Sequence, residues 1–302
     1  MIKKMLKISH INFWDNFDPN NDWLTNFLKH HFGQIKVVSD DNCSDILISS
    51  CFGPLSKVKQ SKAKLKIFYC AENLLRSYKI SEINDLPKIY DLQIDSLGDI
   101  EDYPRRIYMP MWMTYYDYYS FSKIDNICTY INQQRINNFS KTKEYLASLV
   151  ANHDKNGVRE RISKSFEKHG KVHAPGKFMN NTHRIGKSID SKINFISKSL
   201  FNICPENSYI HGYRSEKIIH ALEAGTIPVY WGWQPCKDYL NSKCFIFHDC
   251  SSHGDELVDE AIKNPLKYLN EPIFNNEIES YLEIKYRFLK KTFARLIEKL
   301  NY

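Results

Sequence analysis

The chain has 302 residues, of which 42% are hydrophobic, and it carries a net charge of +7. This length fits two domains of ordinary size, and this composition excludes a disordered chain. No apolar run approaches the ~20 residues of a membrane helix, and residues 1–11 lack the apolar core and cleavage site of a signal peptide, so we expect a soluble, cytoplasmic protein.

The first part of the chain alternates between short apolar runs and a helical pattern. Asp22 precedes apolar residues at helical spacing over 23–30, and we predict it as the N-cap of that helix. Strand-length apolar runs separated by turn residues occupy 6–13, 35–38, 46–49 and 66–70. This rhythm is typical of a parallel, doubly wound sheet.

The middle of the chain changes composition twice. Residues 103–119 are rich in Tyr and Trp, whose rings either stack on sugars or bases or pack at a domain interface. Residues 120–142 are polar and rich in Ser, Asn, Gln and Lys, which predicts a linker.

A second alternating unit begins near Glu144. The predicted strands are 146–150, 227–231 and 244–247, and the predicted helices are 156–168, 215–224 and a long closing helix over 277–300. We therefore predict an N-terminal domain over 1–140, a C-terminal domain over 141–275 and a closing helix over 276–302.

The positive charge is concentrated in residues 151–220, which hold 13 Lys and Arg against 6 Asp and Glu. This surplus equals the net charge of the whole chain and implies an anionic partner: nucleotide phosphates, nucleic acid or a membrane surface. No helix-turn-helix, zinc-finger or RNA-binding signature accompanies the charge, so we expect no nucleic-acid partner. A solvated basic face stays an alternative for most of the lysines taken singly.

The segment 204–232 combines a polar loop, a helix and an apolar strand. In alternating α/β units such a loop binds phosphates, because the helix N-terminus offers unpaired N–H groups and a positive dipole end. Lys217 lies in the first turn of the predicted helix and adds a full positive charge.

Metal and phosphate-loop motifs do not accompany this segment. Gly186-Lys187-Ser188 is not a phosphate-binding loop, because Asn181 stands where the first glycine is required. No Asp-x-Asp pair follows a strand, and the eight cysteines lack metal-ligand spacing. We expect no metal, and protein cations such as Arg159 and Lys217 must then neutralise the phosphates.

These residues resemble the signature of the family 10 glycosyltransferases, the α1,3/4-fucosyltransferases. The segments that match in order and spacing are Glu206-Asn207-Ser208, Tyr213-x-Ser215-Glu216-Lys217-Ile218, Ala221-Leu222 and Gly225-x-Ile227-Pro228-Val229-Tyr230-Trp231-Gly232. Further similarity lies at Phe68-Tyr69-Cys70-Ala71-Glu72-Asn73, at Asn152 with Arg159, and at 169–181. The resemblance spans about 5–250 and is strongest over 200–232.

The resemblance implies a GT-B fold: two Rossmann-like domains that face a cleft, with the C-terminal helix packing back toward the first domain. It implies an inverting, metal-independent glycosyltransferase that moves fucose from GDP-fucose to a hydroxyl of a glycan acceptor. Two alternatives remain: transfer of another deoxysugar from a different nucleotide, and a non-catalytic module of the same fold that binds glycan or nucleic acid.

Site residues follow from the same resemblance. Glu72 is implied as the general base, although a surface carboxylate at a strand end is an alternative, and Glu101 and Asp117 are the next carboxylates to consider. The implied donor-binding residues are Arg159, Asn207, Tyr213, Glu216 and Lys217. Of these, Arg159 and Lys217 would bind the phosphates, and Glu216 would bind the ribose hydroxyls.

Three neighbouring residues bear on the donor loop. Pro205 and Arg214 depart from the family pattern, and we expect them to reshape the donor pocket. Glu206 either touches the ligand or serves as a helix-dipole partner near Lys217.

Overall fold

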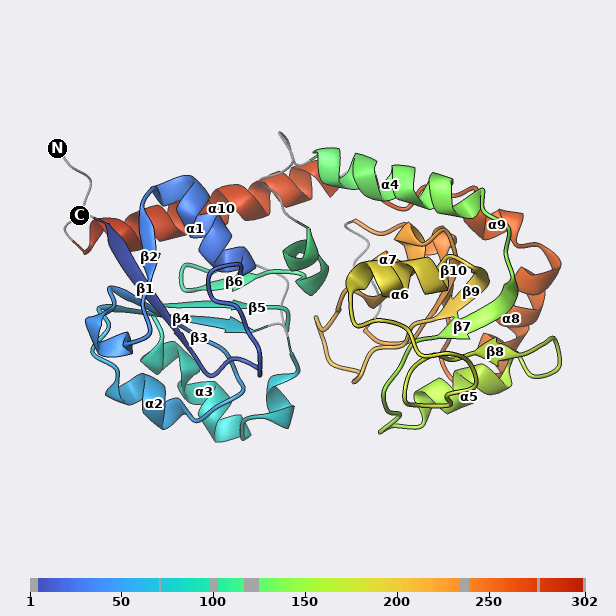
Figure 1. Cartoon of the computed structure of the whole chain (residues 1–302), viewed down its shortest axis with the longest axis horizontal. Coiled ribbons are helices and arrows are strands. Elements are labelled where there is room, and N and C mark those ends of the chain that lie inside the picture. The colour runs from blue at the N-terminus through green and yellow to red at the C-terminus, as the bar shows by residue number, and fades with distance from the viewer. Residues whose placement is uncertain are drawn as a thin grey trace. The chain divides into compact units, whose positions relative to one another are not determined.

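The structure, a computed structural model, describes residues 5–70, 72–97, 103–116, 125–233, 239–275 and 278–300. They form two compact units, each built on a parallel sheet (Figure 1). The first unit contains the described residues up to 116, together with His211–Tyr213 and 282–300, and the second contains the remainder.

The first unit has six parallel strands in the order β2-β1-β3-β4-β5-β6. They are β1 (Leu6–Ile11), β2 (Ile35–Val37), β3 (Ile46–Ser49), β4 (Leu65–Cys70), β5 (Leu92–Asp95) and β6 (Arg106–Tyr108). Every residue of β3 is buried, as expected for a strand in the middle of a sheet covered on both faces.

Helices cover both faces of this sheet (Figure 1). They are α1 (Trp23–Phe32), α2 (Leu55–Gln60), α3 (Ile80–Ile89) and most of α10 (Ile278–Glu298), with short 3₁₀ helices at Asp41–Cys43, Leu74–Arg76 and Met111–Tyr115. The predicted N-cap is confirmed: Asp22 accepts hydrogen bonds from the N–H groups of Leu24 and Thr25.

The closing helix α10 packs on α1, as predicted for the first domain. The ring of Trp23 lies 6.3 Å from that of Tyr286, and the ring of Phe27 lies 5.8 Å from that of Phe293. These aromatic contacts bury the apolar stripe of each helix.

The second unit has five parallel strands in the order β11-β10-β9-β7-β8. They are β7 (Tyr145–Leu149), β8 (Val172–His173), β9 (Ser199–Ile203), β10 (Ile227–Tyr230) and β11 (Ile246–Phe247). The helices are α4 (Asp125–Phe139), α5 (Val158–Lys164), α6 (Ile189–Ile196), α7 (Lys217–Glu223), α8 (Ser252–Lys263) and α9 (Leu266–Leu269), with a 3₁₀ helix at Ser242–Cys244. Figure 1 shows α6 and α7 over one face and α5 and α8 over the other.

The predicted linker over 120–142 is wrong for most of its length, because Asp125–Phe139 is the helix α4. Its buried side includes two polar residues that bond to backbone oxygens. Arg135 donates to Glu271 O at 2.6 Å and to Tyr268 O at 2.9 Å, and Asn138 donates to Glu223 O at 2.9 Å. A helix held by such bonds needs no continuous apolar stripe, so its sequence resembles a linker.

This helix also moves the division between the units. Before α4, the last described residue of the first unit is 116, and the second unit begins with α4 at residue 125. The sequence instead predicts the boundary between the two domains at residue 140. Gly225 allows α4 to approach the end of α7: its φ is +67°, and a Cβ there would lie 2.4 Å from the backbone nitrogen of Phe139.

Candidate active site

A pocket of about 300 Å³ lies at the carboxyl ends of β7 and β9 in the second unit. After β7 the chain crosses to β8 on one side, and after β9 it crosses to β10 on the other. The pocket is therefore at the switch point of the sheet, where open α/β sheets bind their ligands. Its wall contains Leu149, Val150, Ala151, Asn152, His153, Arg159, Lys192, Ile196, Asn202, Ile203, Cys204, Pro205, Asn207, Glu216 and Lys217.

Four of the five predicted donor-binding residues stand on this wall. Arg159, on α5, is 5% exposed and donates to Asn207 Oδ1 at 2.7 Å and to the backbone oxygen of His153 at 2.8 Å. This pair joins the loop after β7 to the loop after β9. It leaves a guanidinium, which suits bidentate phosphate binding, at the edge of the pocket.

Lys217 is held by a buried carboxylate beneath it. Glu206 accepts from Ser215 N at 2.8 Å, from Ser215 Oγ at 2.7 Å and from Lys217 Nζ at 2.7 Å. Burial works against the ammonium, but the Glu206 and Glu216 carboxylates outweigh it and raise the pKa of Lys217. Glu206 thus forms an ion pair with Lys217, and Lys217 stays protonated.

Lys192 is a pocket residue that the sequence analysis missed. Its Nζ donates to Glu216 Oε1 at 3.0 Å and lies 3.3 Å from His220 Nδ1. Burial opposes ionisation of Glu216, but Lys192 and Lys217 outweigh it and lower the pKa of that carboxyl. Ser188 gives the signal that could have located this helix, since it caps α6 by accepting from Ser191 N at 3.1 Å.

Tyr213 does not belong to this wall. It is 1% exposed and is grouped with the first unit, so its contact with a donor stays a prediction. Of the two departures from the family pattern, Pro205 lines the pocket and Arg214 does not. Arg214 is fully buried, with its guanidinium 4.8 Å from the centre of the Tyr239 ring.

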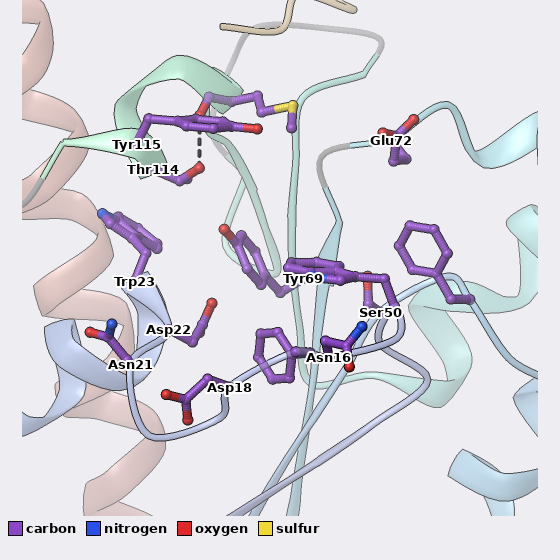
Figure 2. A pocket seen from close by; sticks show the side chains of 14 residues that line it. Asn16, Asp18, Asn21, Asp22, Trp23, Ser50, Tyr69, Glu72, Thr114 and Tyr115 are labelled. Atoms are coloured by element: carbon purple, nitrogen blue, oxygen red, sulfur yellow. Dashed lines mark hydrogen bonds between the residues drawn. The ribbon is translucent and has the colours of Figure 1, made fainter. Parts of the chain in front are cut away.

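Glu72 lies on the wall of a second pocket, of about 530 Å³, in the first unit (Figure 2). It follows the carboxyl end of β4, and its backbone N–H donates to Cys70 Sγ at 3.3 Å. The wall contains Trp14, Asn16, Phe17, Asp18, Asn21, Asp22, Trp23, Ser50, Phe52, Tyr69, Glu72, Met111, Thr114 and Tyr115. The two other carboxylates considered as bases, Glu101 and Asp117, lie outside the described residues.

The aromatic segment 103–119 contains both buried rings and a ring on a pocket wall. Tyr108, Trp112 and Tyr116 are buried and pack inside the first unit. Tyr115 instead lies on the pocket wall with Thr114 (Figure 2). The remaining tyrosines at 118 and 119 lie outside the described residues.

Among the described residues, no group of three or more His, Cys, Asp or Glu side chains is placed to hold a metal ion. No helix in that part of the chain is long and apolar enough to cross a membrane.

Comparison with known families matches most of the chain. Residues 138–270 match the C-terminal model of glycosyltransferase family 10 (fucosyltransferase), and residues 8–115 match the N-terminal domain of α-(1,3)-fucosyltransferase FucT. The α-(1,3)-fucosyltransferase FucT of Helicobacter pylori is 24% identical over 289 residues, which cover 88% of this chain. The chain spans 57% of the length of that relative.

Solved structures share the fold. A crystal structure of an α1,3-fucosyltransferase superposes with a TM-score of 0.73 and 20% identity over 96% of this chain and 90% of the other. A crystal structure of an α1,3-fucosyltransferase with GDP-fucose gives a TM-score of 0.68 and 20% identity over 97% of this chain and 92% of the other. The predicted GT-B fold, with two Rossmann-like α/β domains, is confirmed.

Proposed function

This chain belongs to glycosyltransferase family 10, and from that premise we propose that it moves fucose from GDP-fucose to a hydroxyl of a glycan acceptor, with inversion at the anomeric carbon. The observation that carries the proposal is the charged pocket at the switch point of the second sheet. Among the described residues of its wall, the cations are Arg159, Lys192 and Lys217, and the carboxylate is Glu216.

This surplus of positive charge suits a diphosphate leaving group. When the bond from C1 to the phosphate oxygen breaks, the electron pair stays with GDP and the diphosphate gains negative charge. Cations that are already in place stabilise this charge more in the transition state than in the ground state. Arg159 and Lys217 therefore take the phosphates in our proposal, Glu216 takes the ribose hydroxyls, and no metal ion is needed.

Glu72 acts on the acceptor in this proposal. It takes the proton from the acceptor hydroxyl while the oxygen attacks C1 on the face opposite GDP, through an oxocarbenium-like state. Its place on the wall of the pocket in the first unit supports this role, since an acceptor needs a cavity beside the base.

Pro205 favours one second candidate. It lines the donor pocket and departs from the family pattern, so transfer of another deoxysugar from a different nucleotide is the alternative. Binding of GDP-fucose measured beside other nucleotide sugars separates the two. A non-catalytic module would bind the donor without turnover.

The first prediction tests the base. Glu72→Gln keeps the shape of the side chain and removes the proton acceptor, so transfer falls by ~10²–10⁴ while GDP affinity is unchanged. Transfer rate and GDP affinity are measured in the same preparation, with the exposed Asp85→Asn as the control in the same unit. Normal turnover of Glu72→Gln would move the base to another residue, and loss of GDP binding would make Glu72 structural.

The second prediction tests metal independence. GDP at 100 times its dissociation constant stabilises the protein by about 2.7 kcal/mol. We expect the same rise in melting temperature with and without a chelator, because the pocket cations hold the diphosphate. A rise that disappears with chelator and returns with Mg²⁺ or Mn²⁺ contradicts this.

A further inference from the structure

The pocket around Glu72 differs in kind from the charged pocket of the second unit. No Lys, Arg or His stands among the described residues of its wall, which carries three carboxylates, on Asp18, Asp22 and Glu72. Aromatic rings and neutral amides or hydroxyls make up nearly all of the remainder. Among its described residues the wall therefore offers apolar faces and hydrogen-bond acceptors, and no cation that would neutralise an anion.

Two aromatic rings on this wall are exposed to solvent. Trp14 is 49% exposed and Phe52 is 48% exposed, with ring centroids 5.9 Å apart at an interplanar angle of 77°. Phe17 supports Trp14 at 5.0 Å, and Phe13 stacks on Phe17 at 3.9 Å. These contacts hold the ring of Trp14 in place, and Trp14 in turn contacts Phe52. Exposed aromatic rings of this kind can pack against the C–H face of a pyranose ring.

The carboxylates already make the pocket unfavourable for negative charge. Asp22 is buried at the N-cap of α1, where burial already raises the pKa of its carboxyl to about 6, and a nearby anion would oppose its ionisation further. The histidine behind the aromatic rings supplies no compensating charge, because burial lowers the pKa of His10 to about 4. A ligand that brought a sulfate or carboxylate here would face like charges without a counter-ion on the described residues of the wall.

We propose that this pocket binds the acceptor as an uncharged pyranose, packed against the rings of Trp14 and Phe52 with its hydroxyls donating to Asp18 and Asp22, and that it rejects acceptors bearing sialate, sulfate, phosphate or uronate. The proposal rests on the proposed function for the role of Glu72. It adds the chemical class of the acceptor and the residues that select it.

The test uses pairs of disaccharides. Each neutral disaccharide of hexose and N-acetylhexosamine is compared with its monosulfated form, first for binding by ligand-observed NMR and then for transfer from GDP-fucose. We expect neutral members to bind and sulfated members to bind at least about tenfold more weakly. Equal or tighter binding of the sulfated members, or no saturable binding of any neutral glycan, overturns the proposal.

Variants locate the site. Trp14→Ala and Phe52→Ala raise the dissociation constant of the neutral glycan about tenfold and leave GDP affinity unchanged. The control Tyr103→Ala removes an exposed ring of the same unit that is not on the pocket wall. It leaves the affinities for the neutral glycan and for GDP unchanged. Asp18→Asn keeps the side-chain shape and removes the negative charge. It lowers the ratio of the dissociation constants of the sulfated and neutral disaccharides by roughly threefold. Glycan affinity insensitive to all three wall variants overturns the proposal.

The binding measurement separates this inference from the proposed function. Neutral glycans that bind through Trp14 but receive no fucose would refute the transfer reaction and leave the acceptor class standing. Fucose transfer to sulfated and neutral members with equal kcat/KM would refute the acceptor class and leave the transfer reaction standing.

Discussion

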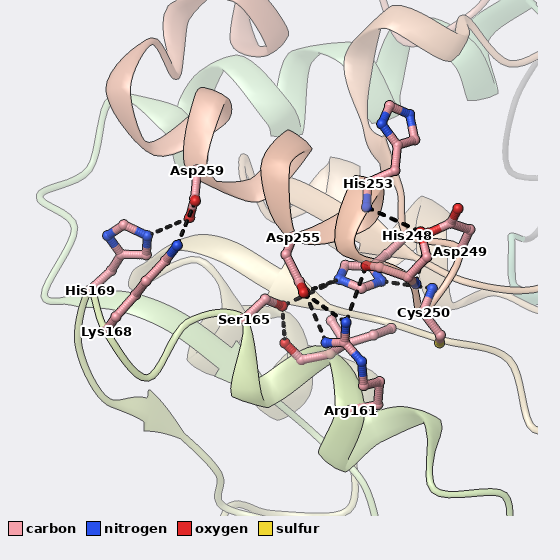
Figure 3. Close-up of polar contacts among 12 residues, drawn as sticks. Arg161, Ser165, Lys168, His169, His248, Asp249, Cys250, His253, Asp255 and Asp259 are labelled. Carbon is pink, nitrogen blue, oxygen red and sulfur yellow. Dashed lines mark hydrogen bonds and ion pairs between the residues drawn. The ribbon is translucent and has the colours of Figure 1, made fainter.

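Two charged clusters of the second unit start from the same turn of one helix. Arg159 and Arg161 both belong to α5, and residues two apart on a helix point in different directions. Arg159 meets Asn207 at the edge of the donor pocket, whereas Arg161 donates to both carboxylate oxygens of Asp255 at 2.8 and 2.7 Å (Figure 3). One guanidinium faces a cavity and the other ties α5 to α8.

The second cluster has the composition of a catalytic triad but not its geometry. His248 Nε2 lies 3.3 Å from both Asp255 Oδ1 and Ser165 Oγ, and His248 Nδ1 accepts from Cys250 N at 3.0 Å. Because Nδ1 accepts, the neutral ring carries its proton on Nε2 and cannot take one from Ser165. This cluster holds α5 and α8 together. The comparison shows that a cluster of charged residues indicates a ligand-binding site only where a cavity lies beside it.

The largest expected difference between the two arginines is in GDP affinity. Arg159→Ala removes a charge-assisted bond of about 1.5–3 kcal/mol, so GDP binds about 10–150-fold more weakly. Arg161→Ala instead lowers the melting temperature and leaves GDP affinity unchanged, because its partner Asp255 lies outside the pocket. Calorimetric titration with GDP and a thermal melt of both variants provide the measurement.

A charge-preserving variant controls for the carboxylate near Arg159. Asp154 Oδ1 lies 4.0 Å from the guanidinium, and removing the cation leaves that buried group without its charge partner. Arg159→Lys keeps the charge and loses the planar fork, so we expect stability close to that of the wild type and weakened GDP binding. If the Arg159 variants bind GDP as tightly as the wild type and as Arg161→Ala, neither arginine lies at the phosphates.

The contrast between the two arginines shows what the sequence could and could not predict. Both lie in the same basic window, and only the family resemblance selected Arg159. Seven of the strands were predictable because their apolar runs are almost continuous, as in β3, whereas β5, β6, β8 and β9 were not identified from the sequence. Lys192 was missed because only the packing of α6 beside α7 brings it to Glu216, and α4 was missed because Arg135 and Asn138 replace part of its apolar face.

A pH titration sharpens the comparison through His220, which is buried beside Lys192 in the donor network. Burial first, and Lys192 second, lower its pKa to about 3 from an unfolded value near 6.5. A lowered pKa means that the unfolded state binds the proton more tightly. The contribution to stability is therefore full above pH 6.5 and is lost as the pH falls toward 3.

The expected loss from this one group is about 2 kcal/mol between pH 7.5 and pH 5. Denaturant unfolding of His220→Gln should show that much less dependence on pH than the wild type over this range. His253 is exposed, and His253→Gln should follow the wild-type curve. Parallel curves for His220→Gln and the wild type would mean that the pKa of His220 in the folded protein equals its value in the unfolded chain.

The smallest predicted effect on donor affinity concerns Lys192, which the sequence analysis did not identify. Lys217 is the poorer choice for such a test, because its removal strands the fully buried carboxylate of Glu206 and costs about 3–5 kcal/mol of stability. Lys192→Gln leaves Glu216 with Lys217 as a cation nearby, so the fold is retained and donor affinity falls by about 1 kcal/mol, roughly fivefold. Lys168→Gln is the matched control, since Lys168 pairs at 2.5 Å with Asp259, away from the donor pocket (Figure 3). If both variants bind GDP-fucose like the wild type, Lys192 serves only to pair with Glu216, and the donor is held without it.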